Sequence, residues 1–343
     1  MIKVNKVDIK ILNHVEEIGN SRLDFKISGS NINYIIVNTI RRTIFSDIPT
    51  YAFNEFNFEK NTSIFHNNYL KLRLRHMPVW GIENTIEFID YNIKINNLET
   101  IPEENEDDDD NVELDVEKNL NMSNLKQFTM YINVKNTSND IINVSTANAK
   151  FYYAEKQIQS PYKNPILILK LQPTQEITFS AITKIGTEQE DAMFGIACIA
   201  AYKEINPNEF DFFIESRGQI SEKRIMYVAI INIERRMQYF LKLLKEDKTN
   251  ITKDDYTNNT KEDNKIMGEI IVNNEDHTLG NLITSGLQLH PKIAFAGYNL
   301  PHPLGKKIIL HYKLKQQSDI KKIIEEVIEY LTDIFSQVKN EFK

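Results

Sequence analysis

Apolar residues recur at helical spacing in two segments that lie far apart in the chain. In the first segment, isoleucines three and four positions apart occupy residues 32–44, and residues 47–49 predict a turn into a strand. In the second, leucines and an isoleucine occupy residues 279–287, and the His-Pro pair at 290–291 again predicts a turn into a strand. Two like segments indicate that one structural unit occurs twice.

A long amphipathic helix is predicted after each segment. Residues 221–245 carry apolar side chains on one face, and residues 318–340 carry a similar, wider stripe. A stripe of this width needs a covering surface, and the other copy of the unit is the obvious one. The pattern therefore predicts an intramolecular pseudo-dimer, which favours a scaffold over an enzyme.

The stretch from residue 50 to about residue 203 is rich in strand patterns. Before it, residues 7–12 and 23–27 read as strands, and residues 28–30 offer a turn and an N-cap for the first helix. Within the stretch, four segments are strand candidates: Ile86 to Ile95, Phe128 to Val134, Ile166 to Leu171 and Ile177 to Ile185.

Two polar runs interrupt these patterns. Residues 102–118 contain consecutive acidic side chains that repel one another, so we expect a loop, with a solvated insertion lacking any partner as the simplest interpretation. Residues 245–265 are rich in Asp, Lys, Asn and Thr and predict a linker between the two copies of the unit.

Composition narrows the function classes. The formal net charge of −7 over 343 residues argues against a surface that binds nucleic acid directly, because phosphate affinity comes from clustered Lys and Arg. No apolar run approaches the ~20 residues that cross a bilayer, so no membrane partner is expected. The single cysteine, Cys198, excludes intramolecular disulfides and a four-cysteine zinc site.

Candidate catalytic and metal-binding residues are sparse. His277, His290, His302 and His311 fall in the second copy, but without the spacing of a known metal motif. The favoured interpretation is that Thr278 or Asp276 caps the helix and that the His-Pro pairs form turns. Cys198 lies in an apolar run and is predicted to be an inert core thiol. Because phosphate loops, nucleophile elbows and magnesium-binding carboxylate clusters are missing from the sequence, we expect no cofactor and no catalytic residue.

Arg41 and Arg42 are the most informative charges. Adjacent positions on a helix point about 100° apart, so these two side chains cannot both lie under the apolar stripe. Matching Pro49 with Pro291 places Ile283 and Thr284 opposite them in the second copy. The two arginines thus belong to one copy only. They predict that this copy presents a distinct face to a large partner; the alternative is that they are two solvated charges on a helix.

Several long motifs carry a resemblance to known proteins. The part of the chain before the linker contains six such stretches, Asn38–Ile44, Ile48–Ala52, Asn61–Ser63, Leu72–Pro78, Leu171–Pro173 and Phe213–Gly218. They resemble the third subunit of eukaryotic RNA polymerase II, the archaeal D subunit and the bacterial alpha subunit. The second half contains Glu275–Leu282, Phe295–Tyr298 and Pro301–Leu304, which resemble the eleventh subunit of that polymerase and the archaeal L subunit. Fusion of the two types is similar to polymerase subunits of large DNA viruses.

The resemblance implies an α+β fold with two alpha-subunit-like dimerisation domains that pair within the chain, and a β-rich domain inserted in the first. The expected boundaries are residues 1–50 and 205–246 for the first dimerisation domain, 51–204 for the insertion with its acidic loop 102–118, 247–266 for the linker, and 267–343 for the second, eleventh-subunit-like domain. The family's four-cysteine zinc loop has no counterpart here, so no zinc is expected.

The implied function is that of a non-catalytic assembly platform of a DNA-directed RNA polymerase. Its expected partners are the largest and second-largest polymerase subunits and a small subunit of the tenth-subunit type. If the source is viral, the expected location is the viral factory in the host cytoplasm, and the virion; otherwise it is the nucleus. The alternative is a small dimerising enzyme resembling pterin dehydratases. Candidate partner-interface residues are Asn38, Arg41, Arg42, Asp276, His277, Thr278, Gly280 and Asn281.

Overall fold

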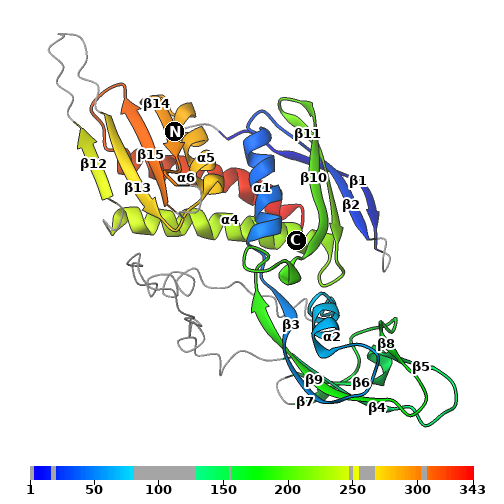
Figure 1. Cartoon of the computed structure of the whole chain (residues 1–343). Helices are drawn as coiled ribbons and strands as arrows, with labels where there is room; N and C mark the ends of the chain where they lie inside the picture. Colours follow the sequence, from blue (N-terminus) through cyan, green and yellow to red (C-terminus); the bar gives the residue numbers. More distant parts are fainter. Residues whose placement is uncertain are drawn as a thin grey trace, which may run out of the picture. The chain divides into compact units, whose positions relative to one another are not determined.

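The computed structural model of the chain describes residues 4–16, 21–80, 128–153, 156–246, 250–254, 267–302 and 307–343 (Figure 1). The chain divides into two compact units. Unit 1 comprises residues 1–48, 197–216 and 222–343, and unit 2 comprises residues 49–196 and 217–221. Both mix helices with sheets, as the sequence predicted.

The first half of unit 1 consists of a four-stranded antiparallel sheet and two helices. The strand order is β1-β2-β11-β10. Buried and partly exposed residues alternate strictly along β2, as expected for a sheet with one face on the core. The elements are β1 (Asp8–Val15), β2 (Arg22–Ser28), α1 (Tyr34–Ser46), β10 (Ala197–Asn206), β11 (Glu209–Ser216) and α4 (Glu222–Lys245).

The second half of unit 1 has the same composition of elements. Its four strands form a sheet in the order β12-β13-β15-β14, and two helices accompany it. The elements are β12 (Asn250–Asp254), β13 (Met267–Asn273), α5 (His277–Leu289), β14 (Ile293–Asn299), β15 (Lys307–Leu314) and α6 (Ile320–Asn340).

Helices of the two halves pack against each other. In unit 1, α4 packs on α6 and α1 packs on α5. Glu234, in the middle of α4, pairs with Lys339 near the end of α6. At the C-terminal end of α4, Lys245 lies 2.6 Å from Glu325 near the start of α6. The contacts run in opposite order along the two helices, so α4 and α6 are antiparallel and cover each other's apolar stripes.

Unit 2 is built mainly from strands. A five-stranded sheet has the order β3-β9-β4-β6-β7, and β5 pairs with β8. The elements are β3 (Thr50–Asn61), α2 (Asn67–Arg75), β4 (Phe128–Lys135), β5 (Ile142–Ser145), β6 (Ala149–Tyr153), β7 (Lys156–Ile158), β8 (Leu167–Leu171) and β9 (Glu176–Gly186), with short 3-10 turns at Thr146–Asn148 and Ala192–Phe194.

Two residues of the Phe213–Gly218 motif stabilise unit 2. The Arg217 guanidinium donates to the carbonyl oxygens of Ala192 and Gly195, at 3.2 and 3.0 Å. Gly218 has a φ of +88°, and a Cβ at this position would lie 3.1 Å from the Trp80 ring nitrogen. The backbone conformation and the close ring both require glycine. These motif residues therefore serve packing rather than chemistry.

Most sequence-based elements are confirmed, with small shifts at their ends. The predicted helices correspond to α1, α4, α5 and α6, and three strand candidates correspond to β4, β8 and β9. The strand candidate at 86–95 and the acidic run at 102–118 lie outside the described residues. The N-cap of α1 is Asn33 instead of a residue in 28–30, since its side chain accepts from the N–H groups of Ile35 and Ile36.

Two predicted boundaries are corrected. Residue 204 was the expected end of the insertion, but it falls inside β10, which pairs with β11 and so belongs to unit 1. Residues 217–221 belong to unit 2, whereas the sequence placed them in the first dimerisation domain.

The predicted linker 247–266 contains the strand β12, which pairs with β13. The edge of β13 supplies the hydrogen-bonding partner that the polar segment lacks by itself.

Candidate functional site

A buried arginine occupies the place where α4 meets the start of α5. Arg236 interrupts the apolar stripe of α4 and is only 6% exposed. Its Nε and Nη2 lie 2.8 and 2.6 Å from Oε2 of Glu275, and Nη2 also lies 2.6 Å from Oδ1 of Asp276. Nη1 lies 3.3 Å from Oδ2 of Asp47, in the turn after α1. One cation from α4 thus holds carboxylates from both halves.

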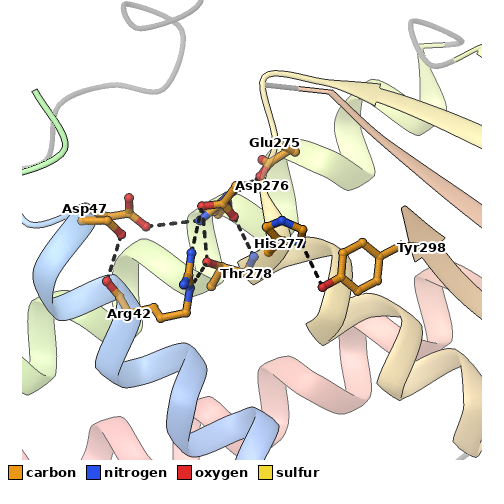
Figure 2. A network of polar contacts seen from close by, with 9 residues as sticks. Arg42, Asp47, Glu275, Asp276, His277, Thr278 and Tyr298 are labelled. Carbon is orange, nitrogen blue, oxygen red and sulfur yellow. Dashed lines mark hydrogen bonds and ion pairs between the residues drawn. The ribbon is translucent and has the colours of Figure 1, made fainter. Parts of the chain in front are cut away.

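Asp276 also begins α5. Its Oδ1 accepts from the Thr278 N–H at 2.8 Å, so Asp276, and not Thr278, is the N-cap (Figure 2). A carboxylate at this position also complements the positive end of the helix dipole. The capping residue therefore connects the helix start to the buried arginine.

Arg42 reaches the same helix start from α1. Its Nε donates to Oγ1 of Thr278 at 2.9 Å, and its Nη2 lies 4.0 Å from Oδ2 of Asp276 (Figure 2). Its side chain remains 43% exposed. The sequence predicted an external partner for this arginine, whereas the contacts seen in the structure are intramolecular.

Burial controls the ionisation of the two carboxyl groups. It raises the pKa of Glu275 to about 7, and the nearby Arg236 charge offsets only part of this effect. For Asp276 burial acts in the same direction, but the Arg236 charge and the Thr278 hydrogen bonds outweigh it and lower the pKa. With Asp47, three carboxyl groups face the guanidinium groups of Arg236 and Arg42. A proton on Glu275 would balance these charges.

His277 and Gly280 form a second contact on α5. The exposed His277 places Nδ1 3.3 Å from the hydroxyl of Tyr298, on β14 (Figure 2). A Cβ on Gly280 would lie 2.7 Å from Cδ2 of Tyr298. The glycine thus lets the tyrosine ring lie directly against the helix, and the ring fixes β14 on α5.

The remaining predicted interface residues lie beside this network. Arg41 donates from Nε to Oδ1 of Asn38 at 3.0 Å, and both side chains are partly exposed on α1. Asn281 is partly exposed on α5, and its carbonyl oxygen accepts from Oγ1 of Thr284 at 3.2 Å. The structure therefore joins Arg42, Asp276 and Thr278 and leaves Arg41, Asn38 and Asn281 outside that cluster.

Sequence reasoning missed Arg236, Asp47 and the role of Glu275. A signal existed in α4, where an arginine occurs next to Met237 within the apolar stripe, a position that a solvated charge would avoid. The carboxylates that compensate it come from a turn and from a different helix start. Their convergence could not be read from local pattern.

The other candidate residues do not form a reactive site. Within the ranges that the structure describes, no three His, Cys, Asp or Glu residues lie close enough to hold a metal ion. His290 is buried as the C-cap of α5, with Nε2 3.3 Å from Glu326. The prediction for Cys198 is wrong, since this thiol is exposed. A bulge between Ala197 and Ile199 turns it out of the core.

Comparison with known proteins supports the resemblance seen in the sequence. Residues 268–341 match the family model described as the RNA polymerase Rpb3/Rpb11 dimerisation domain. A protein of Acanthamoeba polyphaga mimivirus, named as a candidate DNA-directed RNA polymerase subunit, is 25% identical over 355 aligned positions. That alignment covers 97% of this chain and 93% of the mimivirus protein.

Other relatives match about a fifth of this chain. A Caenorhabditis elegans protein named for the RPAC2 subunit of RNA polymerases I and III is 34% identical over 74 residues, or 22% of this chain and 51% of its own length. Subunit rpb11 of RNA polymerase II from Dictyostelium discoideum is 34% identical over 68 residues, or 20% of this chain and 57% of its own length. The similarity to RNA polymerase alpha-like subunits is thereby confirmed.

Proposed function

We propose that this chain, which resembles RNA polymerase alpha-like subunits along nearly its whole length, is a non-catalytic assembly platform of a DNA-directed RNA polymerase. The comparisons support a polymerase subunit of the Rpb3/Rpb11 type. In the proposal, residues 267–343 and the first half of unit 1 act as two dimerisation domains paired in one chain. Unit 2 is the domain inserted in the first of them.

The antiparallel packing of α4 on α6 is the observation that carries this proposal. The matched segment 268–341 contains α5 and α6, and these helices cover α1 and α4 of the first half. A domain whose family description is dimerisation thus has a covering partner in the same chain. Joining both halves on one chain replaces a bimolecular encounter with an intramolecular one, at an effective concentration of ~mM.

The solvent face of α1 is the proposed docking surface for the second-largest polymerase subunit. Tyr34 is 55% exposed on this helix, and Asn38 and Arg41 follow it at one-turn intervals. On α5, the exposed His277 and partly exposed Asn281 extend the same kind of polar surface. Because Arg42 already contacts Thr278, Arg41 is the cation left to contact an external partner.

Other partners and the location follow from the same proposal. The largest subunit and a small subunit of the tenth-subunit type complete the assembly. The mimivirus relative supports a viral context, so the proposed location is the viral factory in the host cytoplasm, and the virion. No helix among the described residues is both long and apolar enough to cross a membrane.

The enzyme alternative is not favoured. A dehydratase-like site would need histidines that converge on a pocket, whereas His290 contacts Glu326 and His311 lies 3.0 Å from Glu269 on another strand. The relatives are named as polymerase subunits instead.

The test is capture of the second-largest subunit of the same source by the purified chain. We expect the parent to capture it and the Asn38→Ala, Arg41→Ala variant to bind at least about 10-fold more weakly, because charged hydrogen bonds at a desolvated interface are costly to lose. Lys322→Ala, which removes an exposed cation from α6, is the matched control and should bind like the parent. Equal capture by all three would exclude α1 as the docking face, and absence of capture by the parent would contradict the platform itself.

A further inference from the structure

The long helices of the two halves make corresponding contacts with different chemistry. In α4, Arg236 reaches Glu275 and Asp276, which precede and cap α5. In α6, Tyr330 reaches the residues before α1, where its hydroxyl accepts from Nδ2 of Asn31 at 2.9 Å. Asn31 lies two residues ahead of the N-cap of α1. Arg236 and Tyr330 therefore occupy equivalent places in the two halves.

Both places are buried, but only one is charged. Arg236 is 6% exposed and Tyr330 is 4% exposed. The first faces two carboxyl groups of the other half, and the second faces a neutral amide. The two equivalent places of the pairing surface thus differ in charge.

Pairing of two like halves would separate Arg236 from Glu275 and Asp276. If the first half paired with a second copy of itself, Arg236 would face Asn31 and Asn33, and the nearest carboxylate would be Asp47 of its own half. If the second half paired with a copy of itself, Glu275 and Asp276 would face the Tyr330 hydroxyl. An unpaired buried charge disfavours a complex far more than a paired charge stabilises it.

The ion pairs between α4 and α6 do not disfavour the pairing of two like halves in the same way. With Arg236 matched to Tyr330, Lys339 matches Lys245 of α4. Glu234, which pairs with Lys339 in the structure, would therefore meet Lys245 if two first halves paired. That contact would still join opposite charges. Arg236 is therefore the residue that disfavours pairing of two first halves.

From this asymmetry we infer that Arg236, together with Glu275 and Asp276, is the selectivity determinant that makes each half of unit 1 pair with the other half rather than with a second copy of itself. The inference rests on the pairing of halves in the proposed function. The partner that fits Arg236 is a helix start carrying the Glu-Asp sequence. The chain thereby forms one closed platform, and cross-paired oligomers of several chains are rejected.

The test uses the full chain with a protease site inserted at residues 255–266, cut after folding. The cut protein is taken through mild denaturant and back, and native mass spectrometry then counts first–second, first–first and second–second pairs. For the parent we expect first–second pairs in at least about 100-fold excess, the ratio implied by breaking one buried ion pair. Parent fragments that do not reassociate would contradict the pairing in the proposed function. Parent fragments that form like pairs freely would overturn only the selectivity.

Two variants separate charge selectivity from simple loss of folding. The neutral variant Arg236→Met, Glu275→Gln, Asp276→Asn keeps a capping side chain on α5, as Asn33 provides on α1, and should form all three kinds of pair. Glu234→Gln with Lys339→Met is the matched control and should keep the parent ratio. Tyr330→Arg should newly produce second–second pairs, because each arginine would meet the Glu275 and Asp276 of the other copy. An unchanged ratio in the neutral variant, or no second–second pairs with Tyr330→Arg, would overturn the inference.

Discussion

Phe342, one residue from the C-terminal end, lies edge-on against Phe25 of β2, with the ring centroids 5.1 Å apart. Both rings are buried. The residues just after α6 therefore complete the core of the first half, while α6 itself covers α4. Val7 supports this contact, since its N–H donates to Oε1 of Gln337 at 2.8 Å. The last helix of the second half and the first strands of the chain form one packed structure.

Phe342→Ala should lower the free energy of unfolding of the whole of unit 1, because it removes a buried ring at the junction of the two halves. We expect a loss of about 3 kcal/mol, measured by denaturant unfolding. Phe295→Ala is the matched control, since Phe295 is 56% exposed and its removal leaves no cavity in the core. Equal losses for the two variants would show that the Phe342 ring contributes no special packing.

Stability should depend on pH through Glu275. The pKa of this group is about 7 in the folded chain against an ordinary value of 4.5, so the folded state holds the proton more tightly. The stabilising contribution of Glu275 to the free energy of unfolding is complete below pH 4.5. This contribution, up to about 3 kcal/mol, is lost as the pH rises through 7. We expect the unfolding free energy of the parent, minus that of Glu275→Gln, to fall between pH 5 and pH 8. A constant difference would contradict the assignment, because other groups cancel in this comparison.

Gly280→Ala should displace Tyr298 from α5. The added methyl would lie 2.7 Å from the ring, closer than packed carbon atoms approach, so either the ring or the helix must move. We expect a cost of about 1–3 kcal/mol in unfolding free energy. Adding Tyr298→Ala should make the glycine substitution nearly neutral. If the cost of Gly280→Ala is the same with and without the tyrosine, the Tyr298 ring is not its cause, and helix propensity cannot be either, since it favours alanine over glycine.

The purified chain should contain no stoichiometric zinc, and a chelator should leave its melting temperature unchanged. The physical reason is the single cysteine together with histidines that contact separate carboxylates, such as His290 with Glu326. Elemental analysis of the native protein is the measurement. Zinc in equimolar amount would contradict this prediction and make the histidines of the second half candidate ligands.

The regular elements could be predicted from sequence because their signals are local. The apolar periodicity of residues 221–245 and 318–340 depends only on neighbouring residues, and the helices observed there begin one or two residues later. Asp276 could likewise be predicted as a cap, since a capping side chain acts on the next few residues. The polymerase resemblance rests on such local motifs as well.

The tertiary structure alone decided which residues meet across the halves. The polar strand β12 exists because β13 offers it an edge, and Cys198 is exposed because a bulge turns it outward. The antiparallel register of α4 on α6 places Arg236 at the start of α5 and Tyr330 ahead of α1. These contacts join residues far apart in sequence, and their geometry follows from how two apolar stripes bury each other, a relation that no local pattern encodes.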